Sequence, residues 1–136
     1  MHELVEHTAD LEVRVVSATL DGLFAETGVA LFEIIAGDLS QIHPRVTQSF
    51  TIPAATPEEM LHELLRSLHA AFEIDRMLLR DIDVRRRHGR LHAVARGEPF
   101  VAARHQLAHE IKGVTRHRFT VRSTPAGWEA TFVVDV

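Results

Sequence analysis

Apolar and polar residues alternate, or recur at helical spacing, along this chain, and the order of these patterns predicts its secondary structure. Residues 11–15 alternate between apolar and charged side chains, as in a half-buried strand. Residues 20–34 then carry apolar side chains three and four positions apart, which is the pattern of a helix with one buried face. Thr19 is suited to cap the start of this helix, and Gly37 is suited to end it.

A loop over residues 38–45 and a strand over residues 46–52 lead to the most strongly marked helix of the chain. Thr56 is a suitable N-cap, Pro57 suits the first helical position, and Glu59 completes a capping box. The predicted apolar stripe of this helix consists of Leu61, Leu64, Leu65, Leu68, Ala71 and Phe72.

The remainder of the sequence predicts two β-hairpins. In the first, a strand over residues 82–87 turns at His88–Gly89 into a partner over residues 90–96, and Gly97–Pro99 is expected to end that partner. In the second, a strand containing Phe119 and Val121 turns at residues 125–127 into a strand over residues 128–134.

Two strand–helix units followed by four strands indicate an α+β fold, a two-layer domain in which two helices pack on one face of a mostly antiparallel sheet. At 136 residues the chain is expected to form a single domain, residues 1–136. The absence of cysteine excludes disulfides, zinc–thiolate sites, iron–sulfur ligation and thiol nucleophiles. No apolar stretch approaches the roughly 18 residues that span a bilayer, and no signal peptide is visible, so a cytoplasmic protein without a membrane partner is expected.

Two aspartates stand near opposite ends of the sequence, each at the end of a predicted strand. Asp10 begins the first strand and Asp135 ends the last one, each on the face opposite its apolar neighbour. If the two strands are neighbours, both carboxylates converge beside the terminal carboxylate of Val136, and three such groups suit a hard cation such as calcium or magnesium. The spacing alone does not force the strands together, so ordinary strand-end aspartates are the alternative.

Other polar motifs have simpler interpretations. In the segment that begins at His7, Thr8 and Asp10 are suited to bond backbone amides in a turn before the strand, which is favoured over a catalytic role for His7 and Thr8. His105 and His109 have the spacing to share a metal on a helix, but no third ligand is marked, so a zinc site is disfavoured.

The charge pattern adds two features. Arginines and one histidine form a basic run at residues 85–90, at a predicted hairpin tip. This run can touch phosphates, but it lacks the aromatic platform of single-strand binders, so a solvated turn is favoured. The net charge of −4 argues against a wholly basic nucleic-acid-binding domain. Lys112 is the only lysine among 15 basic residues, which makes it a candidate for a specific role.

Five short segments occur in a fixed order along the chain: His7-Thr8-Ala9-Asp10, the Leu64–Leu65 pair with Phe72, Gly97–Glu98, residues 110–115 and Asp135–Val136. Taken in this order, they resemble the motifs of the archease family over essentially the whole chain. Two departures stand out. Gly113 replaces the alanine that the family usually has, and the family's aromatic residues around the second helix are here Leu68, His69 and Ala71.

The resemblance implies an α+β archease-like domain that acts as a non-catalytic accessory to an RtcB-type RNA ligase. Such a protein promotes guanylylation and multiple turnover of the ligase in tRNA splicing or RNA repair, and reaches RNA indirectly through the ligase. A modulator of tRNA methylation is the alternative within the family. A metal-dependent phosphoester hydrolase, with the two aspartates holding the ion, is the alternative outside it.

Carried over to this chain, the family's metal site falls on Asp10, Asp135 and Val136. The expected cofactor is a divalent cation, with calcium favoured and magnesium or manganese as alternatives. Lys112 matches the motif lysine, and His7 and Glu98 belong to motifs expected to serve function or contact with the partner.

Overall fold

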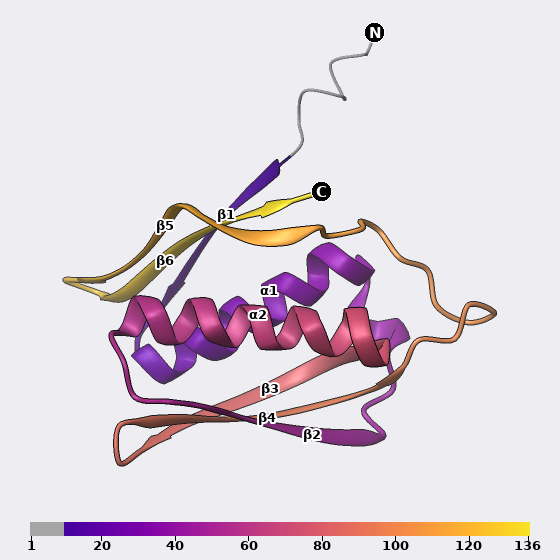
Figure 1. The fold of residues 1–136 in the computed structure, drawn as a ribbon, viewed down its shortest axis with the longest axis horizontal. Helices are drawn as coiled ribbons and strands as arrows, with labels where there is room; N and C mark the ends of the chain where they lie inside the picture. Colours follow the sequence, from indigo (N-terminus) through magenta and orange to yellow (C-terminus); the bar gives the residue numbers. More distant parts are fainter. Residues whose placement is uncertain (1–9) are drawn as a thin grey trace, which may run out of the picture.

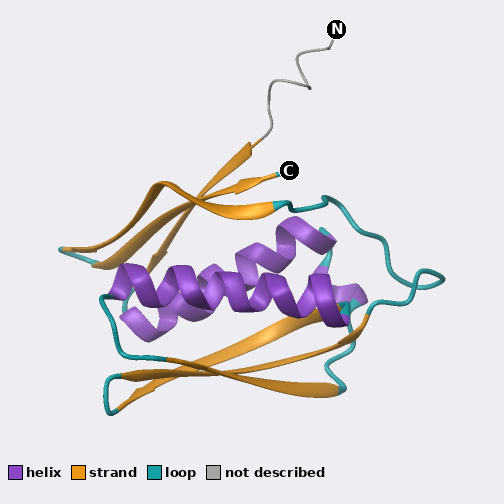
Figure 2. Cartoon of the chain, in the orientation of Figure 1, coloured by secondary structure: helices purple, strands orange, loops and turns teal. Residues whose placement is uncertain are grey.

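Two helices lie between two antiparallel three-stranded sheets in the computed structural model, which describes residues 10–136 (Figures 1 and 2). One sheet has the strand order β1-β6-β5 and the other β2-β4-β3. In chain order the elements are β1 (Asp10–Ser17), α1 (Leu20–Ala36), the 3₁₀ turn η2 (Leu39–Gln41), β2 (Val46–Ile52), α2 (Pro57–Asp75), β3 (Met77–Arg87), β4 (Arg90–Pro99), β5 (Gly113–Thr124) and β6 (Gly127–Asp135).

Both helices begin where their capping residues predict. The Thr19 hydroxyl accepts a 3.0 Å hydrogen bond from the amide of Gly22, and the Thr56 hydroxyl accepts one of 3.2 Å from Glu59. Gly37, with a φ of 78°, ends α1 in a backbone conformation that favours glycine. All six residues of the predicted stripe on α2 are buried, so this part of the prediction is confirmed.

The predicted hairpins are confirmed, but their strands are longer than predicted. β3 begins at Met77 rather than near Ile82, because its first residues are consecutively buried and show no alternation. The partner strand does end within the predicted segment Gly97–Pro99, but at Pro99 and not before Gly97, since all three of these residues pair with β3. β5 begins at Gly113, well before the predicted Phe119.

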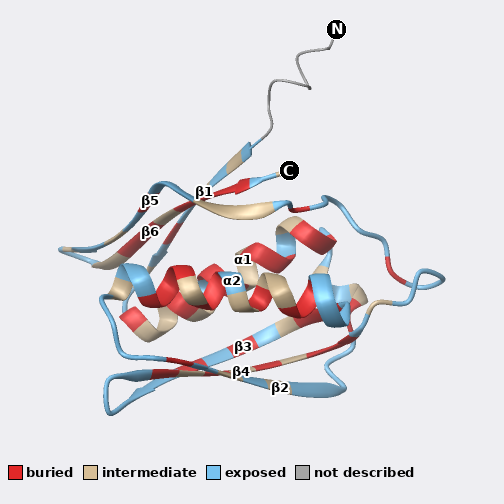
Figure 3. Cartoon of the chain, viewed as in Figure 1, coloured by how far each residue is buried: buried red, intermediate tan, exposed pale blue. Residues whose placement is uncertain are grey.

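The α+β class, with two helices packed against antiparallel strands, is confirmed, while the layering differs from the prediction. The strands divide into two sheets, and the helices form a middle layer that contacts both (Figure 1). α1 can fill this layer because its apolar residues, including Leu23, Phe32 and Ile35, are buried around much of its circumference. Buried residues therefore concentrate on the helices and on the inner faces of both sheets (Figure 3). Neither helix among residues 10–136 is long and apolar enough to cross a membrane.

Candidate functional site

The first and last strands pair with each other, and this pairing brings the two predicted aspartates together. β1 runs antiparallel to β6, with Asp10 directly opposite Asp135 and Leu11 opposite Val134. Directly opposed residues of an antiparallel pair project from the same face of the sheet. The neighbouring Val134 is fully buried against the helices, whereas both aspartates are exposed. The two carboxylates therefore share the outer face at one end of the β1-β6-β5 sheet.

Like charges in directly opposed positions destabilise a sheet unless a counter-charge lies between them. A divalent cation is such a counter-charge, and carboxylate oxygens are the donors that calcium and magnesium prefer. Val136 follows Asp135 directly and is half-buried. Among residues 10–136, no group of three or more His, Asp or Glu side chains is arranged to hold a metal. The carboxylate oxygens of Asp10 and Asp135 are thus suited to a hard cation. Its remaining ligands would have to be groups other than the His, Asp and Glu side chains of residues 10–136.

Lys112 joins the same end of the sheet through its backbone. Its amide donates a 2.7 Å hydrogen bond to the carbonyl oxygen of Asp135, and the next residue, Gly113, pairs with Asp135 in the β5–β6 ladder. Asp135 on the central strand is therefore flanked by Asp10 on one side and by the start of β5 on the other. Lys112 is exposed. Three of the predicted site residues thus gather at this end of the sheet, although they lie far apart in the sequence.

The residue before Lys112 anchors this segment to α2. Ile111 is buried, with 3% of its surface exposed, and its carbonyl oxygen accepts a 2.9 Å hydrogen bond from Nε2 of His69. The same nitrogen lies 3.3 Å from a carboxylate oxygen of Glu73, one turn later on α2. His69 therefore fixes the position from which Lys112 leaves the core. The sequence around His69 gave no signal of this role, because the contact with Ile111 depends on the path of the loop that precedes β5.

The loop of residues 100–112 between β4 and β5 is tied down along its length. The amide of Ala108 donates a 2.8 Å hydrogen bond to the carbonyl of Ile35 at the end of α1. The side chain of Gln41 makes two hydrogen bonds with the backbone of Gln106. Its oxygen accepts from the Gln106 amide at 2.8 Å, and its nitrogen donates to the Gln106 carbonyl at 2.9 Å. These bonds give an irregular segment a defined path to Lys112.

Glu98 lies at the other end of this loop, in a buried polar network. Its carboxylate accepts hydrogen bonds from the amide of His43 at 2.6 Å, from Nε2 of His105 at 2.9 Å and from the Arg104 guanidinium. The bond from Arg104, followed by those from His43 and His105, lowers the pKa of Glu98 to about 2 despite its burial. Only 3% of Glu98 is exposed, so its carboxylate is enclosed by the protein and ties the loop to β4.

Gly97 shows why a glycine precedes this glutamate. A Cβ atom at position 97 would lie 1.8 Å from the carbonyl oxygen of Leu78 on β3, so no other residue fits without displacing backbone. The close approach of the two strands at Gly97 places Glu98 in the buried network. The Gly97–Glu98 motif is therefore explained by the close packing of the strands at Gly97 and by the hydrogen bonds that Glu98 accepts.

The two histidines of the loop have separate partners and do not form a shared site. Residues 105–110 are not helical, so His105 and His109 lack the spacing on one helix face that a shared metal requires. Nδ1 of His105 accepts a 2.9 Å bond from the amide of Val101, which leaves the proton on Nε2 for Glu98. Nδ1 of His109 lies 3.2 Å from the carbonyl of Ile34. His7 and Thr8 lie outside the described residues.

Comparisons with known proteins match nearly the whole chain. Residues 2–136 match the model of the Archease protein family (MTH1598/TM1083). Protein archease of Methanopyrus kandleri is 36% identical over 138 residues, which cover 98% of this chain and 98% of that protein. Protein archease of Methanosarcina acetivorans is 29% identical over 140 residues, covering 99% and 95%.

Two solved structures share the fold. The solution structure of Methanobacterium thermoautotrophicum protein 1598 superposes with a TM-score of 0.78 at 20% identity, covering 95% of this chain and 94% of that one. The crystal structure of a Thermotoga maritima protein, described as an archease and possible chaperone, gives a TM-score of 0.70 at 16% identity, covering 96% and 93%. Because the family model spans nearly the whole sequence and the Methanopyrus relative exceeds 30% identity over it, this chain belongs to the archease family.

Proposed function

We propose that this chain is a non-catalytic activator of an RtcB-type RNA ligase, which promotes guanylylation and multiple turnover of the ligase in the cytoplasm, during tRNA splicing or RNA repair. Membership in the archease family supports this proposal, and so does the description of the Thermotoga maritima relative as a possible chaperone, a protein that acts on other proteins. The observation that carries it is the exposed end of the first sheet, where Asp10, Asp135 and Lys112 meet.

In this proposal Asp10, Asp135 and Val136 hold a divalent cation at the sheet end. Calcium is favoured because it takes 6–8 oxygen ligands in flexible geometry, and magnesium or manganese are the alternatives. The bound cation would supply positive charge that attracts phosphate oxygens of a nucleotide. The two carboxylates hold it by their opposed positions on β1 and β6, and their exposure leaves the outer side of the site open to a partner.

Lys112 has a different task in the same proposal. Its backbone is fixed by the bond to Asp135 and by the buried Ile111, whereas its side chain is exposed. The ammonium group of an exposed lysine whose backbone is bonded to Asp135 can contact acidic groups or a bound nucleotide on the ligase. Opposed carboxylates and one ammonium are suited to binding and orienting charged groups on another protein, which is what an activator requires.

Single-turnover guanylylation of the cognate ligase tests the proposal. With labelled GTP, the ligase alone should form the guanylylated intermediate slowly, and stoichiometric addition of this protein should accelerate the reaction. Asp135→Asn should abolish most of the acceleration. Asp75→Asn, which removes the same charge from the exposed end of α2, is the matched control and should behave as the wild type.

Three outcomes would overturn the proposal. An equal rate and equal turnover of the ligase with and without the protein would exclude activation. Metal-dependent hydrolysis of simple phosphoesters by the protein alone, lost in Asp10→Ala, would instead identify a hydrolase. An effect confined to a tRNA methyltransferase assay would favour the family's alternative role.

A further inference from the structure

The face of the β2-β4-β3 sheet that points away from the helices carries a row of arginines. The pairing of β3 with β4 sets Arg85 opposite His92 and Arg87 opposite Arg90. Directly opposed residues project from the same face. Val84, which precedes Arg85, is buried in the core, and Arg86, between the two arginines, lies 2.6 Å from Asp21 at the start of α1. All four polar residues therefore belong to the outer face of this sheet.

Hydroxyl groups extend the polar surface across the sheet. Thr47, Ser49 and Thr51 on β2 are exposed, and they pair with β4 residues of the same outer face, Thr51 with His92. The face is hollowed by about 380 Å³, and Asp83, Arg85, Arg87, His92, Val94 and Arg96 line the hollow. Within residues 10–136, both helices lie on the opposite side of this sheet and leave the outer face uncovered (Figures 1 and 3).

The arginines at the hairpin end of this face are available to a ligand. Arg85, Arg87 and Arg90 make no ion pair with another described residue. Asp83 precedes Arg85 by two residues on the same face, and this carboxylate lies 3.6 Å from Arg96, which partly neutralises it. A cluster of uncompensated guanidinium groups in a chain of net charge −4 is a local departure from the overall charge.

The outer face of the other sheet differs in this respect. Arg14 and Arg122 both bind the carboxylate of Glu129, the latter at 2.6 Å, and Arg118 lies 3.0 Å from Glu12. These arginines are already neutralised by acidic partners. The hairpin end of the β3–β4 pair is therefore the favoured surface for an anion.

We propose that the outer face of the β2-β4-β3 sheet binds the phosphate backbone of RNA. Residues two apart on a strand stand about 6.6–6.8 Å apart, a spacing close to that of successive phosphates along an RNA strand. Arg85 and Arg87 have this spacing on β3, and guanidinium groups bind phosphate oxygens through two parallel hydrogen bonds. The hydroxyls of Ser49 and Thr51 add hydrogen-bond donors on β2, on the other side of β4 from β3.

An acidic protein surface is the less suitable occupant. Protein interfaces are centred on apolar and aromatic side chains, whereas Val94 is the single apolar residue that lines the hollow. The same lack of aromatic residues means that bases have no stacking platform, so binding should follow the backbone and show little sequence preference. Affinity should lie near the values of non-specific binding, about 10⁻⁴–10⁻⁶ M at physiological salt.

This inference is separate from the proposed activation of a ligase, because binding is measured on this protein alone. Fluorescence anisotropy of a labelled single-stranded RNA, read between about 50 and 200 mM salt, gives the affinity and its salt dependence. Replacing both Arg85 and Arg87 by Gln should weaken binding at least tenfold. The slope of log affinity against log salt should also fall by about 1.4, because each lost phosphate contact removes about 0.7.

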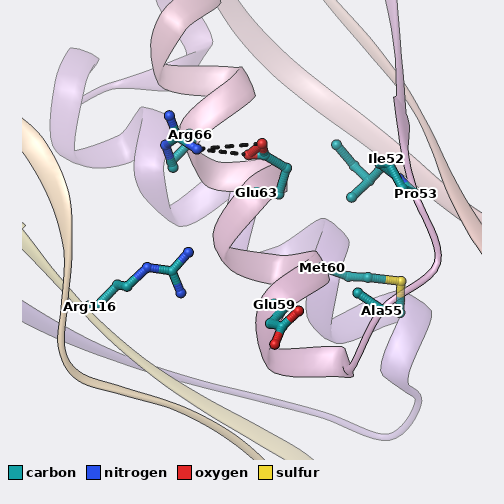
Figure 4. A pocket seen from close by; sticks show the side chains of 8 residues that line it. All are labelled: Ile52, Pro53, Ala55, Glu59, Met60, Glu63, Arg66 and Arg116. Carbon is teal, nitrogen blue, oxygen red and sulfur yellow. Dashed lines mark hydrogen bonds and ion pairs between the residues drawn. The ribbon is translucent and has the colours of Figure 1, made fainter.

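A charge-matched control comes from another surface. Arg66 and Arg116 line a separate hollow between α2 and β5, where Arg66 is bonded to Glu63 at 3.1 Å (Figure 4). Replacing both by Gln removes the same two charges and should leave RNA affinity within about twofold of the wild type. An equal loss in both double variants would show a response to net charge alone and would overturn the site.

Two further results would also overturn the proposal. One is the absence of RNA binding by the wild type at low salt. The other is displacement of RNA by polyglutamate as readily as by unlabelled RNA, which would indicate a surface for acidic proteins.

NMR titration of the wild type with RNA provides a test without substitutions. Changes in amide chemical shift should concentrate at Ser49, Thr51, Arg85 and His92. Changes confined to the end of the β1-β6-β5 sheet near Lys112 would contradict the proposed RNA-binding face.

Discussion

The amide of Lys112 donates a 2.7 Å hydrogen bond to the carbonyl oxygen of Asp135, so the motif lysine and the motif aspartate are joined through their backbones. Neither side chain is needed for this bond. The side chains of Lys112 and Asp135 are both exposed, and each can be replaced without removing the contact that positions the other. Substitutions at these two positions therefore separate function from folding.

Lys112→Ala should abolish most of the ligase activation while leaving the fold intact. Substitutions at exposed positions usually change stability by no more than about 0.5 kcal/mol, so the urea midpoint should match that of the wild type. Lys112→Arg retains the positive charge and should keep part of the activity. Single-turnover guanylylation is the measurement, and full activation by Lys112→Ala would remove this residue from the proposed role.

Asp135→Asn should have opposite effects on stability with and without calcium. In chelator the variant should equal or exceed the wild type by about 0.2–1 kcal/mol, because it removes the repulsion with Asp10 across the β1–β6 pair. With calcium at about 100 times its dissociation constant, the wild type should gain about 2.7 kcal/mol and the variant much less. Thermal unfolding in both conditions measures this, and an equal gain in both proteins would exclude Asp135 as a ligand.

The helices, and the face of its strand on which each aspartate stands, could be predicted because their signals are local. The pairing of the chain ends is not local, and it was expected only from the resemblance to the family. Thr19, Thr56 and Gly37 act on the residues beside them, and the alternation around Asp10 and Asp135 set the face of each strand. The division into two sheets was not predicted. It depends on both helices burying two sides, which a search for one apolar face per helix does not detect.

The start of β5 shows a second limit of sequence patterns. Its register with β6 shifts between Thr115 and Thr120, so that residues 116–119 stand opposite the single residue Phe132. Arg118 adopts a φ of 56° within this bulge. Such an insertion breaks the period of two, which explains why only the part of the strand from Phe119 onward was predicted.

The partners of the 100–112 loop were also beyond prediction, since hydrogen bonds between Gln41 and Gln106 or between Glu98 and His105 join residues with no shared periodicity. The position of Glu98 was indicated only by resemblance to the family motif. Its role in this structure follows from its burial and its three donors.

Glu98→Gln should destabilise the protein by about 1–3 kcal/mol at neutral pH, because Arg104 and His105 lose a charged acceptor inside the fold. The pKa of Glu98 is lowered from 4.5 to about 2, so its contribution to stability is complete above pH 4.5 and is lost as the pH falls toward 2. The difference in the free energy of unfolding between wild type and variant, measured in urea, should therefore shrink as the pH falls from 4.5 toward 2. Glu26→Gln, at an exposed position on α1, is the control, and a constant difference would contradict the role of the charge.

His62 lies edge-on against Phe119 of the β5 bulge, with ring centroids 5.0 Å apart. It projects from the side of α2 that faces the first sheet, and only 4% of its surface is exposed. Neither ring nitrogen has a hydrogen-bond partner among residues 10–136. Burial lowers the pKa of His62 below its ordinary value of 6.5, and the positive charge of Arg116 lowers it further.

The contact between α2 and β5 should therefore weaken in mild acid. The unfolded chain protonates this histidine more readily than the folded protein does, so the contribution of His62 to stability is complete above about pH 6.5 and falls as the pH drops below that value. His62→Leu should remove this pH dependence and raise stability by about 1–3 kcal/mol, because it replaces an unsatisfied buried polar group by an apolar one. Urea unfolding of both proteins at about pH 8 and about pH 5 makes the comparison, since the other titrating groups are common to both. The difference in the free energy of unfolding between variant and wild type should widen at the lower pH. A difference that stays constant would show that the folded protein protonates His62 as readily as the unfolded chain does.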